Sequence, residues 1–174
     1  MDSRVIPTLV CLLIVVAIIG LIALGWNNRK KRQSDIAPLA EVPPKYDDAP
    51  AEVGIPGTYV VTTRMGDWLD RIAVHTLGAK SPAQALIFDD ALIIARDGAQ
   101  DIYIPSSEIS VVRLDSGMSG KFVEKDGLVV ISWQHHGVDL DTGFRTQFAE
   151  DKRILVERLQ LIAPQAHHEL PVQS

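Results

Sequence analysis

The first residues that could do chemistry lie in a glycine-rich stretch, DSGMSGKFVEKDG at 115–127, which contains Gly-x-x-Gly-Lys. A Walker A phosphate-binding loop needs a glycine five positions before its Gly-Lys pair and a Ser or Thr directly after it. Those two positions hold Asp115 and Phe122, and a carboxylate repels phosphate. We therefore interpret the stretch as a flexible turn in which Gly117 and Gly120 adopt positive φ, and we expect it to bind no nucleotide.

A second set of polar residues surrounds the sequence HHG at 135–137. His135 and His136 are followed by Asp139 and Asp141, and all four are types that bind metal ions. Adjacent residues of a strand point to opposite faces, so the two histidines cannot hold one ion without distortion. Asp139 and Asp141 share a face, where paired carboxylates are more often solvated than catalytic. We interpret the group as a polar turn and expect no metal and no cofactor.

Motifs of several large enzyme classes are missing from the sequence. It contains no Gly-x-Ser-x-Gly, no His-Glu-x-x-His and no dinucleotide-binding fingerprint. Its one cysteine, Cys11, allows neither an internal disulfide nor a thiolate metal cluster. We therefore expect a protein that is not an enzyme.

The elements that position these residues are mainly strands. Short alternating or β-rich runs separated by turn residues predict strands at 58–64, 83–88, 91–96, 101–105, 109–114, 128–134 and 138–145. Seven strands joined by tight turns indicate an antiparallel barrel or sandwich, and of these we expect a partly open barrel. The spacing of apolar residues predicts a short helical insertion near 66–77, with Asp67 as its N-cap, and a carboxy-terminal amphipathic helix at 146–163.

The amino-terminal part has a different character. Residues 5–26 form 22 consecutive positions without a charge, which is long enough for a transmembrane helix. A cleaved signal peptide is the alternative, but the run exceeds the usual h-region. Four cations follow, Arg29, Lys30, Lys31 and Arg32. Excess positive charge marks the cytoplasmic flank. We expect a single-pass plasma-membrane protein, with its amino terminus outside and its carboxy-terminal domain in the cytoplasm.

Composition divides the rest of the chain. A short end at 1–4 precedes the transmembrane helix, and residues 27–56 are interpreted as the basic flank followed by a proline-rich, solvated linker. A β-rich domain at 57–163 and a flexible tail at 164–174 complete the chain. Between Gly57 and Ala163 there are 11 Lys or Arg and 15 Asp or Glu, and this acidic balance argues against nucleic acid as a partner.

The order of these elements resembles a pleckstrin-homology-like (PH-like) fold. The amino-acid sequence resembles that of a family of actinobacterial membrane-anchored proteins with a PH-like cytoplasmic domain. The resemblance is carried by the segments GDWLDRI (66–72), VRLDSGMSGKFVEKDGLVVISWQ (112–134) and LDTGFR (140–145). The resemblance implies the fold and the location, but no established activity. PH-like domains bind phosphoinositides, peptides or proteins. The loop cations Lys121 and Lys125 are accompanied by three acidic residues, Asp115, Glu124 and Asp126, so the loop is close to neutral.

We therefore expect a membrane-tethered, non-enzymatic interaction module, an adaptor or scaffold that docks a protein partner. One alternative is an accessory subunit of a membrane transport or export complex, and a weaker one is direct binding of anionic lipid. The expected interaction surface comprises polar and aromatic residues of the resemblance segments: Asp67, Trp68, Asp70, Arg71, Asp141 and Arg145.

Overall fold

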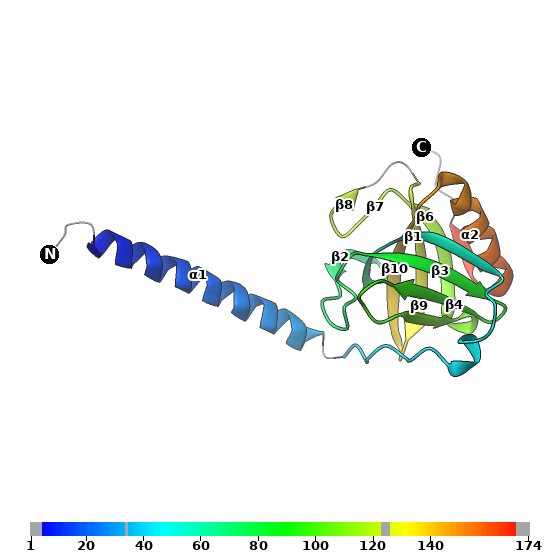
Figure 1. Cartoon of the computed structure of the whole chain (residues 1–174), viewed down its shortest axis with the longest axis horizontal. Coiled ribbons are helices and arrows are strands. Elements are labelled where there is room, and N and C mark those ends of the chain that lie inside the picture. The colour runs from blue at the N-terminus through cyan, green and yellow to red at the C-terminus, as the bar shows by residue number, and fades with distance from the viewer. Residues whose placement is uncertain (1–4, 34, 123–125, 170–174) are drawn as a thin grey trace. The chain divides into compact units, whose positions relative to one another are not determined.

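The computed structural model describes residues 5–33, 35–122 and 126–169 and divides into two units, 1–35 and 36–174 (Figure 1). The first unit is the helix α1 (Val5–Arg32) of 28 residues. A rise of 1.5 Å per residue gives it a length of about 42 Å. It contains the whole uncharged run and continues through the four basic residues 29–32, so this cluster belongs to the last turns of the helix.

A search for membrane spans gives a negative finding. Within the described parts of the chain, no helix combines the length and the apolar character that a membrane crossing requires. This finding differs from the transmembrane helix predicted at 5–26.

The second unit is built on one antiparallel sheet, to which the carboxy-terminal strand adds in parallel. Its order is β11-β6-β9-β10-β1-β3-β4-β5, with β2 pairing β1 off this path. The strands are β1 (Val53–Arg64), β2 (Asp67–Arg71), β3 (Ser81–Phe88), β4 (Ala91–Arg96), β5 (Ile102–Pro105), β6 (Ile109–Asp115), β9 (Leu128–His135), β10 (Val138–Thr146) and β11 (His167–Glu169). The seven predicted strands are confirmed. The order runs from β11 to β5 without closing among the described residues, so the sheet is open.

Two smaller features complete the unit. The hairpin of β7 (Gly117–Met118) and β8 (Lys121–Phe122) forms a separate two-stranded sheet, and the helix α2 (Ala149–Ile162) follows β10. The predicted amphipathic helix is thereby confirmed: Leu155 and Leu159 of α2 are fully buried in the main core. Figure 1 shows α2 along one side of the sheet. Short 3-10 turns occupy Pro44–Tyr46 and Ser106–Glu108.

The long strand β1 joins the two halves of the sheet. It pairs with β3 from Val53 to Tyr59 and with β10 from Gly57 to Arg64. The register against β10 shifts between Tyr59 and Val61, which marks a bulge at this point. A bulge bends its strand and increases the local twist, so β1 can serve two sheet halves that face each other across the core.

The helical insertion predicted near 66–77 is wrong. Residues 67–71 form β2, which pairs with β1, and the backbone N–H of Ile72 continues the pairing by donating to Thr62 O at 3.0 Å. A turn follows, with positive φ at His75 (52°) and Thr76 (60°), values that end any α-helix. Pairing with the free edge of β1 is thus more favourable for this segment than the helix that the spacing of its apolar residues predicted. Leu69, one of the apolar residues whose spacing favoured a helix, is 58% exposed.

The structure also differs from the solvated linker predicted up to residue 56. Ile36 and Leu39 belong to the main core, and Tyr46 is buried as well. We call residues 36–46 the strap. The tail prediction differs at 167–169, which form β11 alongside β6, while residues 170–174 lie outside the described part. In both places, a short segment without a helical or alternating pattern is ordered, the strap by its buried apolar side chains and residues 167–169 by backbone pairing with β6.

The buried position of the strap makes a stability prediction. Leu39 is 6% exposed, and Leu39→Ala is expected to lower the free energy of unfolding by about 2–4 kcal/mol, the usual cost of a truncated core leucine. Glu41→Ala, at an exposed position of the same strap, should change it by less than about 0.5 kcal/mol. Urea denaturation of both variants checks this. Equal, small effects would mean that the strap is solvated.

Candidate interaction site

The expected surface residues lie on two strands that flank β1. Asp67, Asp70 and Arg71 are on β2 and Asp141 is on β10, and both strands pair with β1. In register, Thr63 of β1 lies between Asp141 on one side and Arg71 on the other. Two of the three sequence segments that carried the resemblance, 66–72 and 140–145, therefore meet across a single strand.

Arg145 lies further along β10, where it is exposed and opposite Thr58. The side chain of Trp68 lies outside the described residues, and so do the side chains of Arg29, Lys30, Lys31 and Arg32.

Asp141 is not on the surface. It is 3% exposed, and its carboxylate accepts hydrogen bonds from Ser132 Oγ at 2.6 Å and from Arg113 Nη2 at 2.7 Å. Two residues further along β10, Met118 of the β7–β8 hairpin packs against Gly143, where an added Cβ would lie 2.9 Å from its Sδ. Asp141 therefore forms a buried ion pair with Arg113 rather than an exposed contact.

The charges of β2 are also engaged within the chain. Asp67 Oδ1 accepts the backbone N–H groups of Leu69 and Asp70, both at 3.1 Å, and Arg64 Nε lies 3.2 Å from the Asp70 carboxylate. Arg71 and Arg145 have interactions of their own. Asp67 therefore organises the local turn instead of starting a helix.

A chain of buried hydroxyl groups runs along the inner face of the sheet. Trp133 Nε1 donates to Thr142 Oγ1 at 2.9 Å, and the hydroxyls of Thr142 and Thr62 lie 2.9 Å apart. Tyr59 contacts Thr62 and donates its hydroxyl proton to Leu77 O at 2.5 Å. Burial is the main cause that raises the pKa of Tyr59. Because each polar group in this chain has a partner, it fixes the register of the strands at little cost.

Arg96 holds the turn with positive φ in place. Its side chain is 5% exposed and lies over the Tyr59 ring, 4.7 Å from the centroid. The guanidinium donates to Thr76 O at 3.1 Å, to Thr76 Oγ1 at 2.9 Å and, from Nε, to Gln100 O at 2.7 Å. Burial lowers the pKa of Arg96. These bonds stabilise a φ of 60° at Thr76, which is unfavourable for a β-branched residue.

The histidines bind the strap. His135 Nε2 donates to Ala37 O (3.1 Å) and Pro38 O (3.2 Å), and His75 Nε2 donates to Ile36 O (2.9 Å). Gln100 Nε2 adds a bond to Leu39 O at 3.2 Å. His136 is exposed in the turn after β9, with a φ of 48°, and its ring lies 4.7 Å from the His135 ring between centroids, so the two histidines do not point to opposite faces as expected. Over the described residues, no group of three or more His, Cys, Asp or Glu side chains is arranged to hold a metal ion.

The glycine-rich stretch forms a turn, as predicted. Met118 pairs with Lys121 across a two-residue hairpin loop, in which Ser119 and Gly120 have φ of 52° and 72°. Gly117, also expected at positive φ, lies instead in the strand β7.

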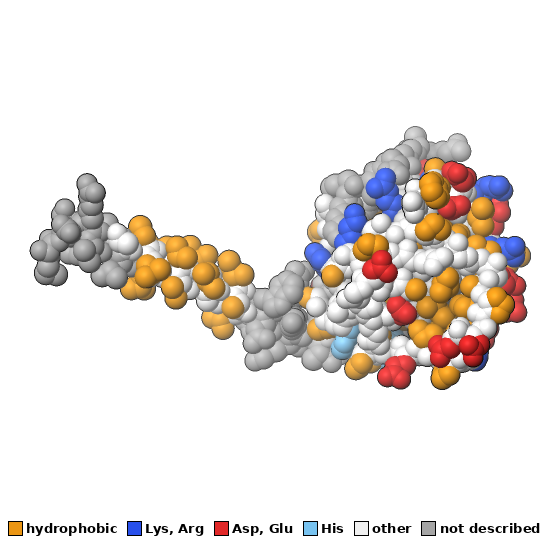
Figure 2. Space-filling model, in the orientation of Figure 1, with side chains coloured by type: hydrophobic (Ala, Val, Ile, Leu, Met, Phe, Trp, Pro, Cys, Tyr) orange, Lys and Arg blue, Asp and Glu red, His pale blue; other side chains and the backbone are white. Residues whose placement is uncertain are grey.

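Sequence reasoning missed an aromatic cluster on the outer face of the sheet. The Tyr46 ring of the strap lies 4.6 Å from Phe88 and 5.7 Å from Tyr103 between centroids. The Tyr46 hydroxyl donates to Asp90 at 2.8 Å, and Lys45 Nζ lies 2.5 Å from the same carboxylate. Figure 2 shows hydrophobic side chains gathered on this face with acidic side chains around them. The available signal was Tyr46 itself, the only aromatic residue between Trp26 and Tyr59.

The buried ion pair leads to a double-mutant prediction. Asp141→Ala leaves the Arg113 guanidinium, 22% exposed, without its carboxylate, and should cost about 3 kcal/mol of unfolding free energy. Adding Arg113→Met should recover part of this loss, because the unpaired charge is removed. Denaturation of both single variants and the double variant gives the coupling energy. Simple additivity of the two losses would contradict the ion pair.

Tyr46 gives a prediction of pH dependence. Burial raises the pKa of Tyr46 from 10.0 to about 12, so the unfolded chain loses this proton at a lower pH than the folded chain does. The contribution of Tyr46 to stability is therefore complete below about pH 10 and declines as the pH rises toward 12. Tyr46→Phe should be less stable than the natural protein at neutral pH, and the gap should close over this window. A gap that stays constant in denaturation series would contradict the assignment.

Similarity to known proteins identifies the family of this chain. A comparison with curated proteins found no match. A solved structure of Vav1 inhibited by an allosteric inhibitor is 17% identical, with a TM-score of 0.41 over 79% of this chain and 33% of that one, so this chain spans about a third of its length. The model of the family described as bacterial PH domain-like matches residues 36–160, from the start of the strap into α2. Because this match covers more than half of the sequence, the chain belongs to the bacterial PH domain-like family.

Proposed function

We propose that this protein is a non-enzymatic interaction module, an adaptor or scaffold that docks a protein partner on its PH-like domain. One observation carries the proposal: the groups best suited to chemistry bind one another or the backbone. Asp141 is held by Arg113 and Ser132, and His75 and His135 hold the strap. These groups maintain the shape of the domain, which leaves its exposed surface as the part that meets other molecules.

Membrane attachment through α1 is a second part of the proposal. Its support is the uncharged run at 5–26 and the exposure of large apolar side chains from Val10 to Leu24, including Leu13 (71%) and Leu21 (68%). Apolar side chains exposed on this scale need a cover of lipid or protein. The basic residues at 29–32 favour a cytoplasmic position for the domain. If the cover is another helix instead of lipid, the protein is an accessory subunit of a membrane complex.

One purification distinguishes these roles. The full chain is compared with a version whose residues 5–26 are replaced by an unrelated membrane helix, and with residues 1–35 alone. One portion of the membranes is washed with alkaline carbonate to test attachment, and a second, unwashed portion is solubilised in mild detergent and affinity-purified for mass spectrometry. We expect the full chain to stay with the membrane through the wash. The same partners should copurify with the full chain and the helix-replaced version, and be missing from 1–35.

Two other outcomes would decide against parts of the proposal. Partners that follow residues 1–35 and vanish on helix replacement would make α1 the recognition element and favour the accessory subunit. Release of the full chain by the carbonate wash would remove the membrane attachment.

A further inference from the structure

The outer face of β3, β4 and β5 carries an apolar surface that the strap covers only in part. Cross-strand pairing places Leu86 beside Ile93 and Ile93 beside Tyr103. Phe88 and Ile93 are buried in a cluster with Tyr46, whereas Leu86 and Tyr103 pack against that cluster and remain half-buried. An apolar row therefore continues from under the strap to the solvent.

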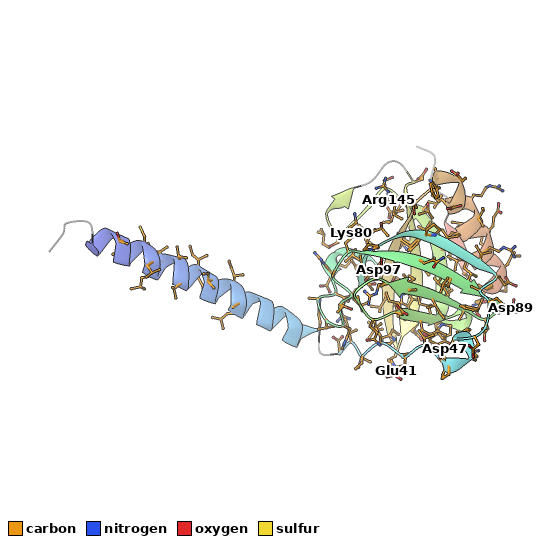
Figure 3. The ribbon with its side chains drawn as sticks, in the orientation of Figure 1. Glu41, Asp47, Lys80, Asp89, Asp97 and Arg145 are labelled. Carbon is orange, nitrogen blue, oxygen red and sulfur yellow. The ribbon has the colours of Figure 1, made fainter. Side chains whose placement is uncertain are left out.

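Carboxylates surround this row. Those of the strap, of the start of β1 and of the turns next to β3 and β4 are exposed: Glu41, Asp47, Asp48, Glu52, Asp89, Asp90 and Asp97. Figure 3 labels Glu41, Asp47, Asp89 and Asp97 at successive positions around the face. We call the apolar row with these seven carboxylates the acid-rimmed face.

Few cations balance this charge. Lys45 pairs with Asp90 at 2.5 Å and Arg158 of α2 with Glu52 at 3.7 Å. Asp47 and Asp97 have no ion pair in the described residues. The proximity of two carboxylates raises the pKa of Glu52, chiefly through a side-chain hydrogen bond with Asp89.

The strap already shows which chemistry this face accepts. A lysine followed by a tyrosine docks on it, with the Tyr46 ring on Phe88 and Tyr103 and the Lys45 ammonium on Asp90. Beyond Tyr46, the apolar row continues in the half-buried Leu86 and Tyr103, and the exposed Glu52 lies beside it, since its backbone N–H donates to Ile87 O at 2.9 Å. The exposed part of the face thus has the two features of its occupied part.

We propose that the acid-rimmed face binds a cationic segment of a protein partner in which a lysine or arginine stands next to an aromatic side chain. This inference rests on the proposed docking function and specifies its surface and its partner. The ring would bury apolar area on Leu86 and Tyr103, while the carboxylates attract the cations and set the orientation. The same negative charge repels nucleic acid and anionic lipid.

The test uses two labelled probe peptides, one of alternating lysine and tyrosine and one of alternating glutamate and tyrosine. Each is titrated with the full-length protein in a non-ionic detergent and followed by fluorescence anisotropy. We expect saturable binding of the lysine peptide, weakened by salt, and no binding of the glutamate peptide. Absence of binding by the lysine peptide would overturn the inference.

Matched charge reversals locate the site. Asp89→Lys/Asp97→Lys, on the acid-rimmed face, should weaken binding of the lysine peptide about tenfold or more. Asp139→Lys/Glu150→Lys changes the net charge equally at exposed positions of β10 and α2, and should alter binding by less than about twofold. Equal weakening by both pairs would mean a general charge effect and overturn the inference. Circular dichroism confirms that both variants are folded.

The outcome is separable from that of the proposed function. If the natural partners still copurify with the Asp89→Lys/Asp97→Lys variant, docking stands but occurs elsewhere, and this inference fails alone. If no protein copurifies with the unaltered full chain, the proposed function fails, whatever the peptide titrations give.

Discussion

The hydrogen bonding of β1 on both of its edges is the constraint on which the rest of this domain depends. One edge pairs with β3 and the other with β10, and β2 adds at its end. β1 pairs with β3 through its first part and with β10 through its second, and the bulge at the register shift after Tyr59 bends the strand between them. With β1 bent, the inner faces of both halves enclose the core, and α2 covers it with Leu155 and Leu159. The outer faces remain available for other roles.

The local sequence pattern was sufficient to predict those elements whose periodicity of apolar residues matches their burial. Alternating β-rich runs with tight turns predicted seven strands, and the apolar stripe predicted α2, because these signals reflect burial on one face. The prediction of a helix at 66–77 was wrong for a non-local reason. The open edge of β1 offers this segment hydrogen-bond partners, whereas an isolated short helix is only marginally stable. The prediction of a solvated linker was wrong at the strap for a similar reason. A proline-rich composition does not reveal that three distant side chains donate hydrogen bonds to the strap carbonyls.

The candidate site shows why polar residue types alone are weak guides to a surface. Asp141 is typical of a contact surface by residue type, yet it is buried, because its carboxylate is held by Arg113 and Ser132 within the sheet. The acid-rimmed face is the opposite case. Its apolar row is contributed by strands predicted correctly, and consecutive apolar residues such as Ile93 and Ile94 place apolar side chains on both faces of these strands. The sequence does not reveal that Tyr46 of the strap packs on the outer face.

The bonds between His135 and the strap have a consequence for synthesis on the ribosome. Ala37 and His135 are 98 positions apart, so the strap is made early and its partner late. Until β9 has left the ribosomal tunnel, Ile36 and Leu39 have no complete core to enter. Contacts of such long sequence separation are slow to form, since the entropy of closing the loop is lost before they are gained. The nascent chain therefore carries exposed apolar side chains beside α1 through most of its elongation, a period in which chaperones find their substrates.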